Sequence, residues 1–102
     1  MKITWDENKN KLNIKDHGLS FQIAKLVFDD PLCITRHDRI ENGEERWQTI
    51  GQIDGKYVVL VAHTYPEIDE VRIISARRLL KKERKHYEEC TNKKTARRTG
   101  RS

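Results

Sequence analysis

Three arginines, Arg72, Arg77 and Arg78, stand near the end of an alternating, β-branched stretch. Residues 71–76 have the pattern of a strand, and the leucines among lysines and arginines after it predict a basic helix. A strand end holds side chains in fixed positions better than a loop does. Because each guanidinium offers a planar fork of donors that stays charged, such a cluster suits the recognition of phosphate.

His63 is a second candidate for a chemical role and directly follows the apolar run 58–62. Histidine gains and loses a proton near neutral pH, so His63 could act as a general acid or base. The alternative is a histidine half buried at a strand end and bonded to backbone. His17 precedes a glycine and is better explained by the helix end, while His37 and His86 lie in polar surroundings that support no chemistry.

Five of the 21 basic residues lie in residues 91–102, which contain no acid, so residues 1–90 carry 16 bases and 16 acids. The net charge of +5 therefore comes from this tail and is weak support for nucleic-acid binding by the folded part. Within residues 1–90 the charges are segregated, with acids grouped at 29–30, 41–45 and 67–70 and bases from 72 to 85. This local dipole is the better electrostatic indication of a charged partner.

A chain of 102 residues, 35% hydrophobic and 36% charged, predicts one small domain with a thin core. We expect a single domain over residues 1–90 and a basic, disordered tail over residues 91–102. Cys33 and Cys90 have no zinc-type spacing and suit two free thiols in a reducing cytoplasm. No stretch resembles a membrane span or a signal peptide, so we expect a cytoplasmic protein without membrane contact.

The N-terminal third predicts a strand and two helices. Lys2–Trp5 reads as a strand, and Asp6 is a good N-cap for a helix that runs to about His17 and ends at Gly18. Ser20 caps a second helix, in which Leu19 can contact Ala24 as a hydrophobic staple. The sequence Asp29-Asp30-Pro31 ends this helix.

Four strands and a last helix follow, over residues 32–38, 45–53, 57–64, 70–76 and 78–89. Asn42-Gly43 lies in a polar loop, Asp54-Gly55 predicts a two-residue hairpin turn, and Tyr65-Pro66-Glu67 predicts a turn. The strand over 57–64 is nearly all apolar, as expected of a central strand covered on both faces. The order predicts an α+β fold, with two N-terminal helices packed on a mostly antiparallel sheet and a C-terminal helix.

Short motifs in this order resemble the BrnT family of type II toxins, over roughly residues 2–89. The motifs are Trp5-Asp6-Glu7, Lys15-Asp16-His17-Gly18, Ser20-Phe21, Val27-Phe28-Asp29-Asp30-Pro31, Glu44-Glu45-Arg46-Trp47, Ile50-Gly51, Ile73-Ile74-Ser75-Ala76-Arg77 and Glu83-Arg84 with Tyr87. The resemblance does not extend to the tail after Glu89 and implies nothing about it.

The resemblance implies a RelE-like fold and an RNA-cleaving toxin that is neutralised by a BrnA antitoxin with a ribbon-helix-helix DNA-binding domain. It further implies that the toxin–antitoxin complex binds operator DNA and represses its own operon. Two other readings stay open: a non-catalytic nucleic-acid-binding or corepressor module on the same fold, and a protein-interaction domain with an acidic partner.

RNA cleavage without a metal uses the ribose 2′-OH as nucleophile and needs a proton acceptor, a proton donor and cations on the phosphorane. The expected catalytic residues are Arg77 and Arg72 on the phosphate, His63 as acid or base, and Lys9 on the first helix. Each also has a structural explanation: Arg77 as a strand-end salt bridge, Arg72 over an acidic neighbour, and Lys9 on a solvated helix face.

Further RNA contacts are expected from Arg78, Lys81 and Lys82, and neither a metal nor a cofactor is expected. Trp5 and Trp47 are more typical of packing than of base stacking. Tyr87 could stack or donate a proton, but its helical spacing favours packing. The tail could add sequence-independent affinity for RNA or DNA or have no consequence.

Overall fold

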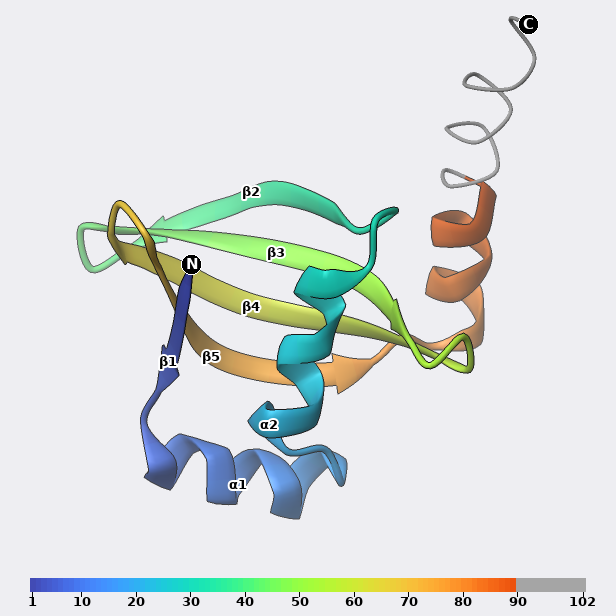
Figure 1. Ribbon diagram of the computed structural model, residues 1–102, viewed down its shortest axis with the longest axis horizontal. Coiled ribbons are helices and arrows are strands. Elements are labelled where there is room, and N and C mark those ends of the chain that lie inside the picture. Colours follow the sequence, from blue (N-terminus) through green and yellow to red (C-terminus); the bar gives the residue numbers. More distant parts are fainter. Residues whose placement is uncertain (90–102) are drawn as a thin grey trace, which may run out of the picture.

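The computed structural model describes residues 1–89 and contains one five-stranded sheet in the order β1-β5-β4-β3-β2. The short strand β1 is parallel to β5, and the other neighbours are antiparallel. The strands are β1 (Lys2–Trp5), β2 (Ile34–Glu41), β3 (Glu44–Ile53), β4 (Tyr57–Glu67) and β5 (Glu70–Arg78), and the helices are α1 (Glu7–His17), α2 (Phe21–Ala24) and the 3₁₀ helix η1 (Lys25–Asp29). The predicted α+β class and mostly antiparallel sheet are confirmed (Figure 1).

The ends of α1 are set by local sequence, as predicted. The Asp6 side chain accepts a hydrogen bond from the Asn8 backbone N–H at 2.8 Å, and Gly18 ends the helix in the left-handed region at φ 65°. Ser20 caps α2 by accepting from the Ile23 N–H at 3.2 Å. The second predicted helix is therefore present, but it tightens into η1 after Ala24.

The main core lies between α1, α2, η1 and one face of the sheet. Its buried members come from the second helical segment and from β3, β4 and β5: Leu19, Phe21, Ala24, Val27, Ile53, Val59, Val61, Ile73 and Ala76. Gly51 on β3 permits the close approach of η1, because a Cβ there would lie 2.9 Å from the Val27 carbonyl oxygen. The prediction of β4 as the central strand is confirmed.

The side chain of Asn13 completes the outer edge of β5. Strand β1 pairs only with residues 70–73, which leaves Ala76 without a strand neighbour on that side. Asn13 supplies both missing bonds, since its Nδ2 donates to the Ala76 carbonyl at 2.9 Å and its Oδ1 accepts from the Ala76 N–H at 3.0 Å. The same Nδ2 donates to the Leu19 carbonyl at 2.8 Å, so one buried amide joins α1, the loop after it and the sheet.

The two hairpin turns differ from the prediction. Asn42-Gly43, expected in a longer loop, forms the two-residue turn between the paired residues Glu41 and Glu44, with φ 53° and 77°. Asp54-Gly55 also has positive φ at both residues, 55° and 65°. However, Ile53 pairs with Tyr57, so Lys56 is left over and the loop has three residues.

The predicted turn at Tyr65-Pro66-Glu67 is wrong, because β4 continues to Glu67. The pairing of β4 with β5 shifts register between Thr64 and Glu67, so Pro66 lies in a β-bulge. A bulge tolerates proline because the missing N–H is not needed for pairing there. The chain instead turns at residues 68–69, and Ile68 is 97% exposed.

The C-terminal helix occupies residues 81–89, since β5 includes Arg78 and leaves residues 79–80 as a linker. It lies at the end of the sheet where β3 turns into β4 (orange in Figure 1). The expected tail over residues 91–102 falls outside the described residues. No helix within residues 1–89 is long and apolar enough to cross a membrane.

Candidate active site on the open face of the sheet

The face of the sheet opposite α1 and α2, here called the open face, is covered at one end by the helix over 81–89. Tyr87 from this helix is buried against Ile50 and Leu60. Its hydroxyl donates to Asp30 Oδ2 at 3.1 Å, and that carboxylate also accepts from the Gln52 N–H at 2.7 Å. Burial, followed by the charge of Asp30, raises the pKa of Tyr87, so the neutral phenol anchors the helix to the fold.

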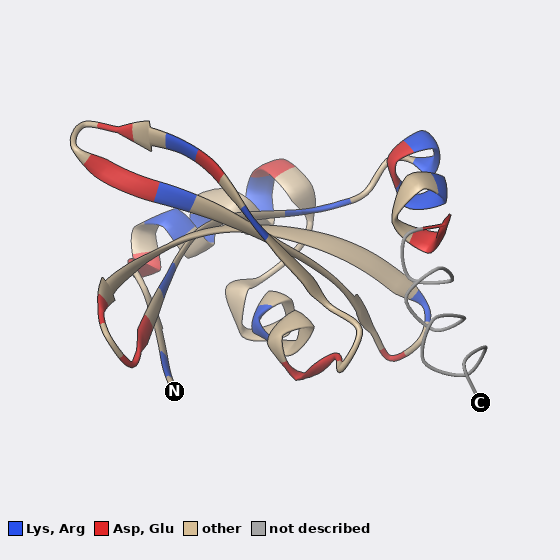
Figure 2. Cartoon of the chain, turned by 90° about the horizontal axis from the view of Figure 1, so that it is seen from above, with Lys and Arg blue, Asp and Glu red and all other residues tan. Residues whose placement is uncertain are grey.

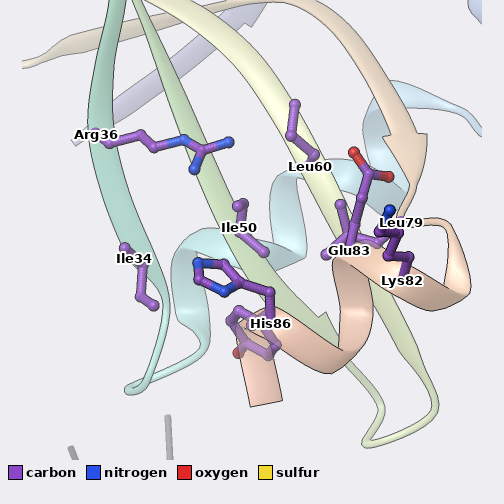
Figure 3. A pocket seen from close by; sticks show the side chains of 9 residues that line it. Ile34, Arg36, Ile50, Leu60, Leu79, Lys82, Glu83 and His86 are labelled. Carbon is purple, nitrogen blue, oxygen red and sulfur yellow. The ribbon is translucent and has the colours of Figure 1, made fainter. Parts of the chain in front are cut away.

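A cavity of about 470 Å³ opens between this helix and the sheet. Its floor is apolar and its rim carries charged side chains from β2 and the helix, as Figure 3 shows. The lining residues are Ile34, Arg36, Ile50, Leu60, Leu79, Lys82, Glu83, His86 and Tyr87. Concave sites with a few convergent polar groups are the usual form of ligand sites.

Arg77 and Glu83 form a two-pronged ion pair beside the cavity. Arg77 Nη1 and Nη2 donate to the two Glu83 carboxylate oxygens at 2.8 and 2.9 Å, and Glu83 also accepts from the Leu80 N–H at 2.9 Å. The hydrogen bonds from Arg77 and then from Leu80 lower the pKa of Glu83 to about 2. The same pair raises the pKa of Arg77.

Arg36 brings a second guanidinium to the cavity from β2. Its Nε donates to Gln48 Oε1 at 2.9 Å, which directs the side chain across the open face (Figure 3). The positive charge of Arg36 further lowers the pKa of Glu83. On the helix, Glu83, His86 and Tyr87 share one face because residues three and four apart lie above one another.

A bulge in β5 decides where the sequence-predicted arginines point. Ala62 pairs with Ser75 and His63 pairs with Ile73, so Ile74 is an extra residue. Ile73 and Ala76 both lie in the main core, although they are an odd number of residues apart. Consequently Arg72 and Arg77 both lie on the open face, which a regular strand with its alternating side chains would not allow.

Arg72 shares the open face with Arg77 but not its cavity. The two residues are five apart on β5, roughly 15 Å at a strand's rise per residue. The Arg72 side chain is 54% exposed, and its guanidinium lies 3.8 Å from Glu70. The structure thus brings Arg36 and His86 to one cavity, with Arg77 bonded to the lining residue Glu83, and leaves Arg72 further along the same surface.

His63 lies in the core rather than at the open face. Its side chain is fully buried between the rings of Phe28 and Tyr65, with centroids 5.3 and 5.2 Å away. Its Nε2 shares a hydrogen bond of 2.8 Å with Thr49 Oγ1, and burial lowers its pKa to about 4. A neutral, enclosed imidazole has no access to an RNA phosphate, so the structure does not favour the expected role as acid or base.

Lys9 and Arg78 also lie away from the cavity. Lys9 is an exposed residue of α1 and lines a shallow depression at the edge of β5 with Asp16 and Ser75. Arg78 points to the side of α1 and α2, where its guanidinium lies 4.6 Å from the centre of the Tyr57 ring. The Arg78 side chain therefore lies on the other face of the sheet from Arg77, although its backbone carbonyl accepts a hydrogen bond from Arg77 Nη1 at 3.4 Å.

The predicted RNA-binding lysines lie on the C-terminal helix. Lys82 lines the cavity and also a basic outer surface of the helix. That outer surface is formed by Lys81, Lys82, Arg84, Lys85 and Glu88. Basic residues, blue in Figure 2, recur along this helix.

Both tryptophans pack against other aromatic rings, as the sequence predicts. Trp5 meets the Phe21 ring edge-on at 6.1 Å, and Trp47 lies between His37 and Tyr65 on the core side of the sheet. Within residues 1–89 no group of three His, Cys, Asp or Glu side chains is placed to hold a metal ion.

Comparisons with known proteins agree with this architecture. The sequence model described as "Ribonuclease toxin, BrnT, of type II toxin-antitoxin system" matches residues 5–83. The chain belongs to the BrnT family. Among solved structures it is similar to the Brucella abortus ribonuclease toxin BrnT, at 31% identity and a TM-score of 0.61, over 79% of this chain and 99% of that one. No curated protein sequence matches it significantly.

The BrnT match contains Arg36, Arg77 and Glu83 but ends before His86. Sequence reasoning did not select Arg36, because the register of β2 against β3 is not visible in the sequence. Glu83 and His86 did carry a signal, since their spacing with Tyr87 places them on one helix face.

Proposed function

We propose that this BrnT-family toxin is an endoribonuclease that needs no metal ion and cleaves RNA by attack of the ribose 2′-OH on the adjacent phosphate. The observation that carries the proposal is the cavity on the open face, which Arg36, Lys82, Glu83 and His86 line and beside which Arg77 is bonded to Glu83. Cations fixed before the reaction stabilise the charge of a phosphorane, because they need no rearrangement when that charge develops.

In this proposal Arg77 and Arg36 bind the non-bridging oxygens of the scissile phosphate. Two guanidinium forks, one from β2 in the cavity and one from β5 beside it, suit the planar geometry of phosphate oxygens. His86, on the same helix face as Glu83, donates a proton to the leaving 5′-oxygen. The products are a 2′,3′-cyclic phosphate and a free 5′-hydroxyl.

Arg72 and Lys81 contact flanking phosphates of the RNA rather than the reacting one, since both lie outside the cavity. Lys9, Arg78 and His63 take no step in this mechanism. The overall arrangement, with a sheet face flanked by a C-terminal helix, supports the expected RelE-like grouping of the fold.

The family membership implies an antitoxin partner. We infer an antitoxin of the BrnA ribbon-helix-helix type that covers the open face and, in the complex, binds operator DNA and represses the operon. An acidic segment of the antitoxin complements the arginines that bind RNA, which explains inhibition by competition. We further propose that this activity on RNA is cytoplasmic.

The test is induction of the toxin and of its Arg77→Ala variant in cells without antitoxin. The unchanged toxin stops growth and lowers translation. Removing a guanidinium from the phosphate lowers turnover by roughly a hundredfold or more, as for other preorganised donors. Stability changes by about 1 kcal/mol or less, because the Arg77–Glu83 pair is more than one third exposed.

Arg39→Ala is the matched control, because Arg39 is an exposed arginine with acidic neighbours on the β2–β3 hairpin. It leaves toxicity unchanged. Full toxicity of Arg77→Ala contradicts the proposed site. Normal growth with soluble, RNA-binding toxin instead favours the non-catalytic nucleic-acid-binding module.

A further inference from the structure

The phosphate-binding edge of Arg77 is already occupied by a carboxylate. Both Nη donors of Arg77 are used by the two oxygens of Glu83, at 2.8 and 2.9 Å. An RNA phosphate that binds the guanidinium end-on needs the same two nitrogens, because carboxylate and phosphate both present paired oxygens to Nη1 and Nη2. RNA and Glu83 therefore compete for Arg77.

The pair is open to this exchange. The side chains of Arg77 and Glu83 are 38% and 37% exposed, and Glu83 lines the cavity. The ion pair is thus a contact that substrate can open.

We propose that the scissile phosphate displaces Glu83 from Arg77 and that the released Glu83 carboxylate is the catalytic base that takes the proton of the attacking 2′-OH. This inference rests on the proposed ribonuclease function and adds to it an identity for the base.

The structure supplies a reason why the released carboxylate stays at the reacting centre. Glu83 lies three residues after Leu80 and accepts from its N–H at 2.9 Å, in the manner of a helix-capping glutamate. This bond does not involve Arg77 and persists after the exchange. The nearby guanidinium of Arg36 adds a second attraction from β2.

The exchange also turns a weak base into a competent one. With Arg77 bound, the pKa of Glu83 is held at about 2, and a carboxylate that binds protons so weakly is a poor acceptor. When phosphate takes Arg77, the largest cause of that lowering is removed and the pKa rises. The charged groups that face Glu83 are Arg36 from β2, Arg77 from β5, and Lys82 and His86 from its own helix.

The proton and bond changes balance. Glu83 Oε accepts the 2′-OH proton while the 2′-oxygen forms its bond to phosphorus. The bond from phosphorus to the 5′-oxygen breaks, and that oxygen takes a proton from the His86 imidazolium. Transfer of one proton from Glu83 to His86 through solvent restores the starting state.

The test compares Glu83→Gln with the unchanged toxin on an RNA oligonucleotide and on the same oligonucleotide with a 2′-deoxy sugar at the cleavage position. Glutamine keeps the size and can still accept from the Leu80 N–H, but it cannot accept the proton or compete as an anion. We expect kcat to fall at least a hundredfold, within the range for a general base, while the 2′-deoxy analogue binds several-fold more tightly.

The pH profile gives a second readout. The acid limb of kcat, which reports groups in the enzyme–RNA complex, reflects the released carboxylate in the unchanged toxin and is absent from Glu83→Gln. Glu88→Gln is the matched control, because Glu88 accepts from Arg84 at 2.9 Å on the outer part of the same helix. It leaves kcat, KM and the pH profile unchanged.

Three results overturn the inference. Higher kcat in Glu83→Gln means that Glu83 only masks Arg77, and an unchanged acid limb means that another group is the base. A fall in kcat with weaker binding and a lower melting temperature, beyond the effect of Glu88→Gln, means that the pair is structural. Failure of the unchanged toxin to cleave the RNA oligonucleotide, in contrast, rejects the proposed function itself.

Discussion

The burial of His63 makes the stability of the fold sensitive to acid. Its pKa is about 4 in the folded protein against 6.5 for an ordinary histidine. Below about pH 6.5 the unfolded chain therefore binds a proton that the folded protein excludes, until the pH approaches 4. Stability is full above this window and falls as the pH drops through it, by up to about 3 kcal/mol.

Urea unfolding at pH 7.0, 5.5 and 4.5 measures this effect, with His63→Gln as the comparison. Glutamine does not titrate, so the variant is less stable at pH 7 but loses less stability between pH 7.0 and 4.5. If the free energy of unfolding depends on pH equally in the two proteins, a group other than His63 causes the acid sensitivity. Glu83 does not produce this window, because its pKa of about 2 moves its own loss of stability below about pH 4.5.

Individual residues also show what the sequence could reveal. The arginines of β5 are predicted to bind phosphate from their residue type alone, because guanidinium chemistry does not depend on the fold, and this role stays a prediction. The core-facing position of His63 also follows from the sequence, since His63 alternates with Val59 and Val61, which face the core. The position of Arg36 in the cavity could not be predicted, because it depends on the distance between β2 and a helix that lies far along the chain.

At the scale of elements, Asn13 holds α1 against the edge of β5, and Asn13→Asp tests this directly. Aspartate keeps the acceptor for the Ala76 N–H but loses the donor to the Ala76 and Leu19 carbonyls, and it buries a charge. We expect a loss of about 2–4 kcal/mol, because buried acceptors are left without partners. Urea unfolding measures it.

Asn8→Asp on the exposed first turn of α1 is the control for Asn13→Asp. A carboxylate near a helix N-terminus is neutral or slightly stabilising. If the two variants have equal stability, the bonds of Asn13 to β5 contribute nothing and the edge is held by packing alone.

Local signals predicted helix ends well and strand ends less well. Asp6, Gly18 and Ser20 act through bonds to residues within four positions, so the sequence contains all the information. Pro66 and Ile74 instead lie in bulges that depend on the partner strand. The bulge at Ile74 matters most, because it turns Arg77 toward the open face.

At the scale of the whole molecule, charged side chains are unevenly distributed over the elements. Mixed charges occupy the β2–β3 hairpin, while basic residues gather on the C-terminal helix (Figure 2). The arginines of the open face serve RNA and antitoxin alike in our proposal. Binding of the antitoxin therefore weakens as salt rises, because charge complementarity is screened.

Charge reversal at Arg72 and Arg77 tests this sharing. Arg72→Glu with Arg77→Glu should reduce antitoxin affinity and RNA cleavage together, measured by titration at several salt concentrations and by oligonucleotide cleavage. If cleavage is abolished while antitoxin affinity and its salt dependence are unchanged, the antitoxin binds elsewhere and does not act by covering the open face.

The parallel pairing of β1 with β5 has a consequence for the order in which contacts form during synthesis and folding. Lys2 lies opposite Glu70, so the first strand to be synthesised has no partner until the last strand has been made. Contacts so distant in sequence form late, because a long loop must close first. Arg77 lies on that last strand and Glu83 follows it. Under our proposal, a chain interrupted before β5 lacks both Arg77 and Glu83 and therefore does not cleave RNA.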